Sequence, residues 1–365
     1  MDPKLVREIH SRTGKFVVAI TGGGVSALSE LLKVPGASNT LLSAFIPYHA
    51  EELSHFIGSH PDQSCSSQTA RSLAMAAYQR AIKIEGDEPV FGLGCTAALA
   101  TNRERRGDDR CYIAIQSSTF TTEISVVFDK DQRTRSEEEG LCASLLLGFM
   151  ANILGMDNDA TGELRTTDDF SRKMVKAEES WQSLLAGNTK TTEAGNSNGL
   201  VFPGAFNPLH QGHLNMIRYA EELNGRQVTL EISVFNVDKP PLDFIEMHLR
   251  QDALGNRPLI FTHAPTFLEK CRIFPGTTFL VGSDTMSRIA EPQYYNASTD
   301  QRDSALIEIA EAGSKFLVFG RSSDNEFVTL DDLQLPETLT AICIKVPENE
   351  YRVDISSTEI RTNLQ

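Results

Sequence analysis

The chain has 365 residues, of which 40% are hydrophobic and 23% charged, and its formal net charge is −15. This length is about twice that of a typical domain, and it predicts two globular domains. The acidic balance argues against a general nucleic-acid-binding or anionic-membrane surface, because both need a basic face. It leaves room for a local basic pocket that binds a nucleotide.

The six cysteines are scattered along the chain without a CxxC pair, at Cys65, Cys95, Cys111, Cys142, Cys271 and Cys343. This spacing indicates neither a disulfide framework nor a zinc site, and we expect reduced thiols in a cytoplasmic protein. The polar N-terminus shows no signal-peptide pattern. The uncharged stretch Gly140–Met156 is shorter than the roughly 20 residues of a spanning helix. It predicts a buried core helix.

In the first half, strand patterns alternate with amphipathic helix patterns, which predicts a three-layer α/β domain over residues 1–165. We expect strands over residues 15–20, 39–48, 88–99, 110–118 and 122–129, and helices over 26–34, 66–84 and 140–156. The charged segment 161–185 predicts a solvated helix, and Ala186–Gly199, rich in Gly, Ser, Thr and Asn, predicts a flexible linker. Residues 166–199 would therefore join this domain to the next.

The alternation restarts over residues 200–365. We expect strands over residues 199–206, 227–236, 259–264, 277–284 and 340–347, helices over 212–223, 243–254 and 264–274, and a helix followed by a strand within 302–321. Repeated β-α-β units with apolar strands predict a second three-layer α/β domain, a Rossmann-like fold with a parallel sheet. Ligands of such sheets bind at the carboxyl ends of the strands.

The stretch GAFNPLHQGH, Gly204–His213, lies where the first of these strands meets its helix. Gly204 would let a ligand approach the backbone, and the first helix amides favour an anion. The imidazoles of His210 and His213 could donate hydrogen bonds to phosphate oxygens or, as cations, neutralise developing charge. Taken alone, they could equally be two surface histidines near a turn.

A second motif, DISSTEIR, spans Asp354–Arg361 near the C-terminus. The hydroxyls of Ser356, Ser357 and Thr358 could form a simple helix cap, or they could hold the β- and γ-phosphates of a nucleotide while Arg361 adds charge. One motif opens the second domain and the other closes it. Together they indicate a triphosphate site.

On these two motifs, residues from Leu200 onward resemble the HxGH/ISSTxxR nucleotidylyltransferase superfamily. The stretches VGSD and ISSTEIR are most similar to the nicotinate or nicotinamide mononucleotide adenylyltransferases, and NVDKPPLDF fits their substrate segment loosely. The resemblance implies adenylyl transfer from ATP to the mononucleotide, with release of pyrophosphate. Mg²⁺ would bridge the ATP phosphates, without a metal site on the protein.

The same resemblance assigns the site residues. It implies that His210 and His213 are catalytic. It implies nucleotide or phosphate contacts for Gly204, Phe206, Asn207, Gly212, Gly282, Asp284, Ser356, Ser357, Thr358 and Arg361. Lys239 and Arg321 are further candidates, each equally consistent with a solvated surface charge.

Residues 1–155 resemble the CinA C-terminal domain, the nicotinamide-nucleotide amidase family, in stretches such as VAITGGGVSALSELLKVPGAS. Thr21 stands where that family has its serine nucleophile and Ile20 where it has a glutamate. Tyr48 matches the family's tyrosine, but the lysine expected after it is missing. Because a threonine nucleophile needs a nearby base, we expect a retained binding fold or a dimerisation module rather than an amidase.

Several alternatives stay open. The loop arginines Arg103, Arg105 and Arg106 could hold a phosphate or could simply be solvated. The second domain could use another acceptor, such as phosphopantetheine or a CTP-linked alcohol phosphate, or the chain could be a nucleotide-binding regulatory protein. We expect small-molecule substrates and neither nucleic acid nor membrane as partners, with a homo-oligomer through the N-terminal domain as an option.

Overall fold

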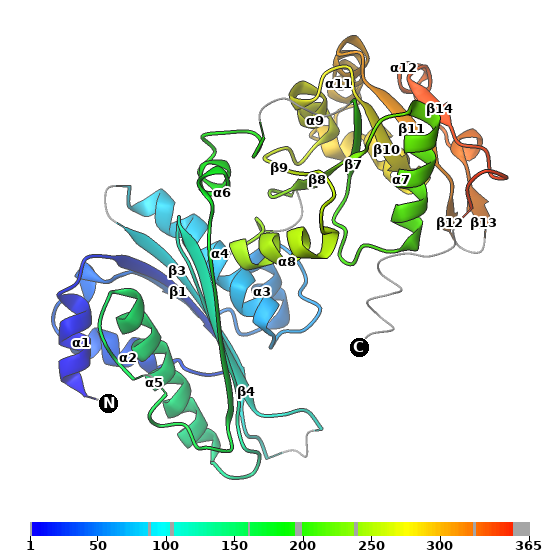
Figure 1. Ribbon diagram of the computed structural model, residues 1–365. Coiled ribbons are helices and arrows are strands. Elements are labelled where there is room, and N and C mark those ends of the chain that lie inside the picture. Colours follow the sequence, from blue (N-terminus) through cyan, green and yellow to red (C-terminus); the bar gives the residue numbers. More distant parts are fainter. Residues whose placement is uncertain are drawn as a thin grey trace. The chain divides into compact units, whose positions relative to one another are not determined.

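The computed structural model describes residues 2–86, 89–102, 106–159, 161–193, 199–236, 240–323 and 326–352. The chain forms two compact units (Figure 1). The first comprises Met1–Glu178 together with Asp238–Glu246, and the second comprises Glu179–Val237 together with Met247–Gln365. Both units are layered α/β structures, as the sequence predicts.

The first unit is built on a six-stranded mixed sheet in the order β2-β1-β3-β4-β5-β6. Its strands are β1 (Lys15–Thr21), β2 (Leu41–Phe45), β3 (Val90–Ala98), β4 (Arg110–Gln116), β5 (Phe120–Val127) and β6 (Asp169–Lys176). Its helices are α1 (Pro3–His10), α2 (Ser26–Lys33), α3 (Ala50–Ile57), α4 (Ser67–Ile84) and α5 (Arg135–Ile153). Strand β1 pairs in parallel with β2 and β3, and the remaining pairs are antiparallel.

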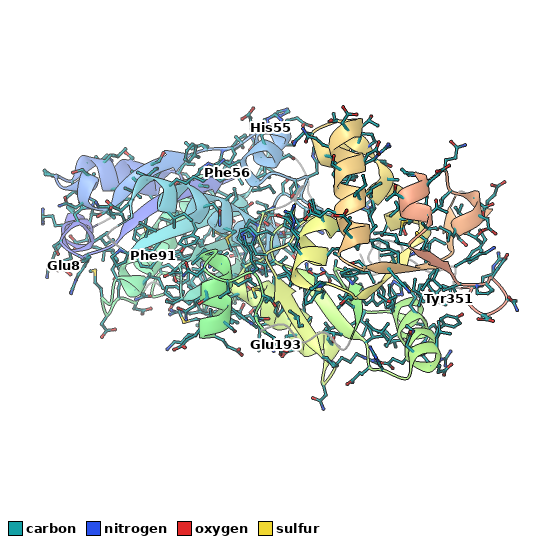
Figure 2. The ribbon with its side chains drawn as sticks, turned by 90° about the horizontal axis from the view of Figure 1, so that it is seen from above. Glu8, His55, Phe56, Phe91, Glu193 and Tyr351 are labelled. Carbon is teal, nitrogen blue, oxygen red and sulfur yellow. The ribbon has the colours of Figure 1, made fainter. Side chains whose placement is uncertain are left out.

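Alternating side chains of β1 divide the core of this unit between the two faces of the sheet. Phe16, Val18 and Ile20 pack with α1, α2 and α5, whereas Val17 and Ala19 pack with α3 and α4. Phe16 and Phe91 stack at 4.9 Å between ring centroids in the first of these layers, and Figure 2 labels Phe91. The unit is therefore three layers deep, as predicted.

The uncharged stretch predicted as a core helix lies mostly in α5. Leu145, Leu146, Leu147 and Phe149 are each at most 1% exposed, so this prediction is confirmed. Thr134 and Glu137 form a capping box at the start of the helix. Among the described residues, no helix is long and apolar enough to cross a membrane.

The second unit contains a six-stranded sheet in the order β14-β11-β10-β7-β8-β9. Every pair in it is parallel, as predicted. Its strands are β7 (Leu200–Pro203), β8 (Thr229–Ser233), β9 (Leu259–Thr262), β10 (Thr278–Gly282), β11 (Lys315–Phe319) and β14 (Cys343–Lys345), beside a hairpin of β12 (Arg321–Ser323) and β13 (Glu326–Val328). Its helices are α6 (Glu179–Leu185), α7 (Gln211–Asn224), α9 (Phe267–Ile273), α10 (Ser283–Ala290), α11 (Thr299–Glu311), α12 (Glu337–Thr340) and most of α8 (Phe244–Leu254).

The strand order reverses at the centre of this sheet. From β7 the chain first builds β8 and β9 on one side, and then returns to β10, β11 and β14 on the other. The carboxyl ends of β7 and β10 therefore form the topological switch point at which α/β sheets bind ligands. Helices α9 to α12 contribute to the core cluster on one face, which includes Phe316 and Val318. On the other face, Tyr219 of α7 packs against Phe319 with ring centroids 5.8 Å apart.

Two expectations for the middle of the chain are wrong. Residues 161–185 do not form one solvated helix, because Asp169–Lys176 is strand β6, paired antiparallel with β5. The expected flexible linker is also partly fixed to the second sheet. Thr192 N donates to Phe261 O at 3.0 Å, and His263 N donates to Lys190 O at 2.9 Å. Both results depend on pairing with strands that are distant in sequence, which local patterns do not reveal.

Candidate functional site

The histidine motif occupies the switch point of the second sheet. His210 is the N-cap residue of α7, in the loop that follows β7. Gly212 N donates to His210 Nδ1 at 3.1 Å, and His210 N donates to His213 Nδ1 at 3.3 Å. Because each Nδ1 accepts a backbone N–H, the proton of each neutral ring is carried by Nε2. The helix start thus fixes both imidazoles as Nε2–H donors.

The two imidazoles lie face to face, with ring centroids 3.7 Å apart. Burial, followed by the charges of His210 and Arg321, lowers the pKa of His213 to about 3. Burial and the charge of Arg321 also lower the pKa of His210. The pair is therefore neutral at physiological pH, so it could interact with a ligand by donating hydrogen bonds but not as the cations that the sequence left open.

His210 carries the clearest mark of a binding role. Its Nε2 is buried and has no hydrogen-bond partner within the part of the chain that the structure describes. A buried donor that is left unpaired costs about 1–3 kcal/mol, and such a group in a native fold requires an explanation. An acceptor oxygen supplied by a ligand would satisfy it.

Phe206 packs against His213, the second histidine of the motif. Its backbone is left-handed, with φ of 47°, and its ring is 2% exposed. The ring edge packs against Phe202 and His213, with centroids 5.2 Å apart in each pair. A Cβ on Gly204 would lie 2.8–3.1 Å from the ring of Phe206. In this structure Gly204 therefore makes room for Phe206, whereas the sequence suggested room for a ligand.

Gly282, Asp284 and Arg321 meet at the ends of β10 and β11. Arg321 Nε lies 3.6 Å from Asp284 Oδ1. A Cβ on Gly282 would overlap Asp284 Oδ1 and lie 3.0 Å from Arg321 Nε. The charge of Arg321 acts on the pKa of both histidines. The structure thus brings together His210, His213, Gly282, Asp284 and Arg321, which the sequence predicts from three stretches that together span more than 100 residues.

The C-terminal motif and several cations lie outside the described residues. These are Ser356, Ser357, Thr358 and Arg361, together with Lys239, Arg103 and Arg105. The described chain ends close to the motif helix, however, because Tyr351 Oη donates to Gly212 O at 3.3 Å (Figure 2 labels Tyr351). Burial raises the pKa of Tyr351 to about 12, so its hydroxyl keeps the proton.

The first unit has a similar turn between β1 and α2, and there a side chain of the protein occupies the start of the helix. Glu139 Oε1 accepts from Ser26 N at 2.9 Å, and Glu139 Oε2 accepts from Ser26 Oγ at 2.6 Å. A carboxylate thus occupies the start of α2, where a helix favours an anion. Arg135 Nη2 donates to Gly22 O at 3.3 Å in the same turn.

The residues that match the amidase motif show no catalytic arrangement. Thr21 is buried at the end of β1, and no side chain among the described residues forms a hydrogen bond with it. Tyr48 is 67% exposed. Arg106 is exposed and follows the loop residues that the structure does not describe.

Residues 201–363 match the cytidylyltransferase-like family. This match includes both motifs of the second domain and supports a nucleotidyltransferase. Within the described residues, no group of His, Cys, Asp and Glu side chains is arranged to hold a metal ion. No curated protein is a significant match to the chain.

Solved structures similar to this chain match its N-terminal half. A competence/damage-inducible protein from Agrobacterium tumefaciens is 15% identical with a TM-score of 0.36, and the match covers 42% of this chain and 95% of that one. A CinA superfamily protein from Escherichia coli is 13% identical with a TM-score of 0.32, covering 41% and 89%. Another from Enterobacter cloacae is 12% identical with a TM-score of 0.34, covering 42% and 91%.

Sequence reasoning missed some residues that shape this site. Arg250 Nη1 donates to Ala205 O at 3.2 Å, and Tyr351 contacts Gly212 as described. At the neighbouring ends of β8 and β9, the rings of Phe235 and His263 stack at 3.8 Å. Only the position of Phe235 and His263 at the carboxyl ends of predicted strands could have pointed to them. Arg250 lies within a charged helix and has no sequence signal of its own.

Proposed function

We propose that the second unit transfers the adenylyl group of ATP to nicotinamide or nicotinate mononucleotide and releases pyrophosphate. The observation that carries the proposal is the pair of neutral, buried imidazoles at the switch point, with His210 Nε2 unpaired among the described residues. Such donors suit phosphate oxygens, on which charge develops during the transfer. ATP enters as its Mg²⁺ complex, so that the ion belongs to the substrate.

In the proposed reaction, a phosphate oxygen of the acceptor attacks the α-phosphorus of ATP. The bond from that phosphorus to the oxygen bridging it to the β-phosphate breaks, and the electron pair leaves with pyrophosphate. His210 and His213 donate hydrogen bonds from Nε2 to phosphate oxygens, and Arg321 supplies positive charge beside them. No covalent intermediate with the protein forms, so the residues act by positioning and by stabilising charge.

The C-terminal motif takes the role of a grip on the leaving pyrophosphate. Its position is supported by Tyr351, whose hydroxyl contacts Gly212 between the two histidines. Ser356, Ser357, Thr358 and Arg361 follow Tyr351 by only five to ten residues in the sequence, which supports this assignment.

A second candidate donor is CTP, and the family match favours it by name. The matched family is described as cytidylyltransferase-like. The neutral histidine pair would serve a cytidylyl transfer equally well, because it addresses phosphates and not the base. The acceptor would then be an alcohol phosphate, whereas phosphopantetheine remains an alternative acceptor with ATP.

We propose that the first unit keeps the fold but does not catalyse amide hydrolysis. Glu139 fills the start of α2, and Thr21 has no base beside it among the described residues. The proposal places the protein in the cytoplasm, where its six free cysteines would stay reduced.

A pyrophosphate-release assay over a substrate panel tests the proposal. ATP and CTP are each combined with nicotinamide mononucleotide, nicotinate mononucleotide and phosphopantetheine, after thermal shift has ranked the ligands that stabilise the protein. We expect release with ATP and a nicotinamide or nicotinate mononucleotide. Release with CTP would favour the second candidate. Binding without release in any combination would contradict transfer and support a regulatory nucleotide-binding protein.

A further inference from the structure

A buried ion pair lies near the carboxyl ends of β8 and β9 in the second unit. The ammonium of Lys270, on α9, contacts both carboxylate oxygens of Glu231, on β8, at 2.8 Å each. The two side chains are 7% and 1% exposed. Apolar residues of similar volume often stabilise a core as well as such a pair does, so the pair is better explained by a geometry that it fixes.

The pair holds the chain at the point where β9 ends. Thr262 is the last residue of β9, and its Oγ1 donates to Glu231 Oε1. Two residues later, Ala264 O accepts from Lys270 Nζ at 2.8 Å. Because an ammonium has three donors, Lys270 fills them with two oxygens of Glu231 and one of Ala264. The turn 262–264 is therefore tied to β8 and to α9 at its two ends.

His263 lies between these two anchored residues. Its ring stacks on that of Phe235, two residues beyond the end of β8, with centroids 3.8 Å apart. Its Nδ1 is buried and has no hydrogen-bond partner within the residues that the structure describes. A buried polar atom without a partner requires an explanation, and a ligand at this edge of the sheet would supply one.

This turn lies on the opposite side of the sheet centre from the residues proposed to contact the triphosphate. Gly282 and Asp284 lie where β10 meets α10, whereas β8 and β9 follow β7 on its other side in the strand order. Strand β8 adjoins the histidine loop directly, because Gly204 N donates to Glu231 O at 3.0 Å. In the proposed reaction, the ends of β8 and β9 are therefore the place for the acceptor.

We propose that Lys270 is a positioning residue for the acceptor. With Glu231 it fixes the turn 262–264, and this turn holds the imidazole of His263 on Phe235 at the acceptor side of the site. Lys270 does not touch the substrate, because its three donors bind oxygens of the protein. The identity of the acceptor rests on the proposed function, whereas the hold on the turn involves contacts of the second unit alone.

The main test variant combines Lys270→Met with Glu231→Gln in the full-length chain. The two substitutions remove both charges together, so no unpaired charge stays buried, as it would in Lys270→Met alone. Glutamine can still accept from Thr262 Oγ1, whereas methionine cannot donate to Ala264 O. The double variant thus releases the turn from α9 while the side-chain volumes in the core stay similar.

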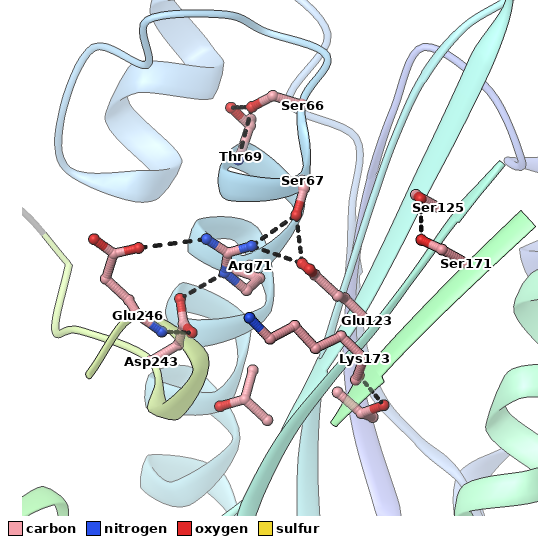
Figure 3. A network of polar contacts seen from close by, with 12 residues as sticks. Ser66, Ser67, Thr69, Arg71, Glu123, Ser125, Ser171, Lys173, Asp243 and Glu246 are labelled. Atoms are coloured by element: carbon pink, nitrogen blue, oxygen red, sulfur yellow. Dashed lines mark hydrogen bonds and ion pairs between the residues drawn. The ribbon is translucent and has the colours of Figure 1, made fainter. Parts of the chain in front are cut away.

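Two controls separate the hold on the turn from a general loss of stability. Cys271→Ala changes the next residue of α9, which is 1% exposed and belongs to the core cluster of Phe279 and Phe316. Glu123→Gln removes the charge of a carboxylate that binds Arg71 Nη1 at 2.7 Å within the first unit (Figure 3). Both controls alter a buried or mostly buried side chain and leave the contacts of the turn in place.

Peptide-resolved hydrogen exchange measures the hold on the turn without any ligand. We expect the amides of residues 262–266 to exchange several-fold faster in the double variant and at the wild-type rate in both controls. An unchanged turn in the double variant would overturn the proposal, as would an equal acceleration in Cys271→Ala.

Binding of each substrate alone tests the consequence for the acceptor. Isothermal titration calorimetry gives the Kd of nicotinamide mononucleotide and, separately, the Kd of ATP with Mg²⁺. We expect the double variant to raise the first Kd about tenfold and to leave the second within about twofold, and both controls to change neither. A merely structural role would weaken both ligands together, so an equal loss for the two would contradict the proposal.

Steady-state kinetics separate this proposal from the proposed function. Where the wild type releases pyrophosphate, we expect the KM of the mononucleotide to rise about tenfold in the double variant, with kcat and the KM of ATP within about twofold. An unchanged KM of the mononucleotide would overturn the proposal. Absence of turnover in the wild type would contradict the proposed function, whereas the exchange measurement would still decide whether Lys270 holds the turn.

Discussion

Two turns in this chain follow a buried parallel strand and lead into a helix, and they differ in what faces the start of that helix. In the first unit, Glu139 binds both the backbone and the hydroxyl of Ser26, so the anion position is already filled. In the second unit, His210 caps α7 through Nδ1 and leaves Nε2 unpaired among the described residues. The start of α2 is thus occupied by a carboxylate of the protein, whereas the start of α7 presents a donor that an anion could bind.

This difference indicates that a glycine-rich turn before a helix is not evidence of a phosphate site until its surroundings are known. Both turns satisfy the sequence pattern for anion binding. What separates them is a carboxylate 113 residues away in the first case and the absence of any described acceptor for His210 in the second.

The largest expected effect comes from removing the unpaired donor. His210→Ala deletes the imidazole that would meet a phosphate oxygen, and we expect kcat for pyrophosphate release to fall about 10²–10³-fold, as is typical for the loss of one such donor. Steady-state kinetics with saturating triphosphate measure it. A variant that keeps more than half of the wild-type kcat would remove His210 from the mechanism.

A smaller effect, on stability, is expected at Gly204, whose position leaves room for the ring of Phe206. Gly204→Ala would place a Cβ 2.8–3.1 Å from the ring of Phe206. The ring must shift and His213 with it, at a cost of about 1–3 kcal/mol in the free energy of unfolding. Denaturant unfolding measures this cost. If the variant is as stable as the wild type, Gly204 does not serve to admit Phe206.

The buried histidine also predicts a pH dependence of stability. The pKa of His213 is lowered from 6.5 to about 3 by burial and neighbouring charge. Between these values the unfolded chain holds a proton that the folded chain lacks, so the free energy of unfolding falls as the pH falls. The slope due to His213 is up to about 1.4 kcal/mol per pH unit.

His213→Asn isolates this contribution, because asparagine does not titrate. We expect the difference between wild type and variant in unfolding free energy to shrink steadily from about pH 6.5 to 4.5, measured by urea titration. A difference that stays constant over this range would mean that His213 is protonated in the folded state as readily as in the unfolded chain.

The smallest effect is expected at the turn before α2 in the first unit, where Glu139 occupies the start of the helix. Glu139→Ala removes the carboxylate from the start of α2 and should cost about 1 kcal/mol of stability, similar to the loss of an N-cap. It should also open the turn to an anion. Hydrogen exchange over residues 20–28 should then slow on addition of inorganic phosphate in the variant and not in the wild type. Equal protection in both proteins would show that the turn of the first unit is already open.

Much of the fold follows from the sequence, because it depends on local periodicity. The apolar strands of the second half and their helices predict the parallel sheet, and that sheet places the histidine loop at its switch point. The buried helix α5 follows from an uncharged stretch that is too short to span a membrane.

The remaining features depend on contacts between distant residues. Strand β6 is charged and forms only because β5 supplies its hydrogen bonds. Glu139 directly precedes the helix predicted over residues 140–156, and nothing in its neighbourhood indicates that it accepts hydrogen bonds from Ser26. Lys270 and Glu231 are 39 residues apart, so their buried ion pair has no local signal. For the site, the sequence identifies the histidines but not that burial keeps them neutral.

The most direct test of the account is pyrophosphate release measured side by side for the wild type, Thr21→Ala and His213→Ala, with ATP and a nicotinamide or nicotinate mononucleotide. The account predicts that Thr21→Ala stays within about twofold of the wild type and that His213→Ala falls at least about 100-fold. Turnover in His213→Ala equal to that of the wild type would contradict it.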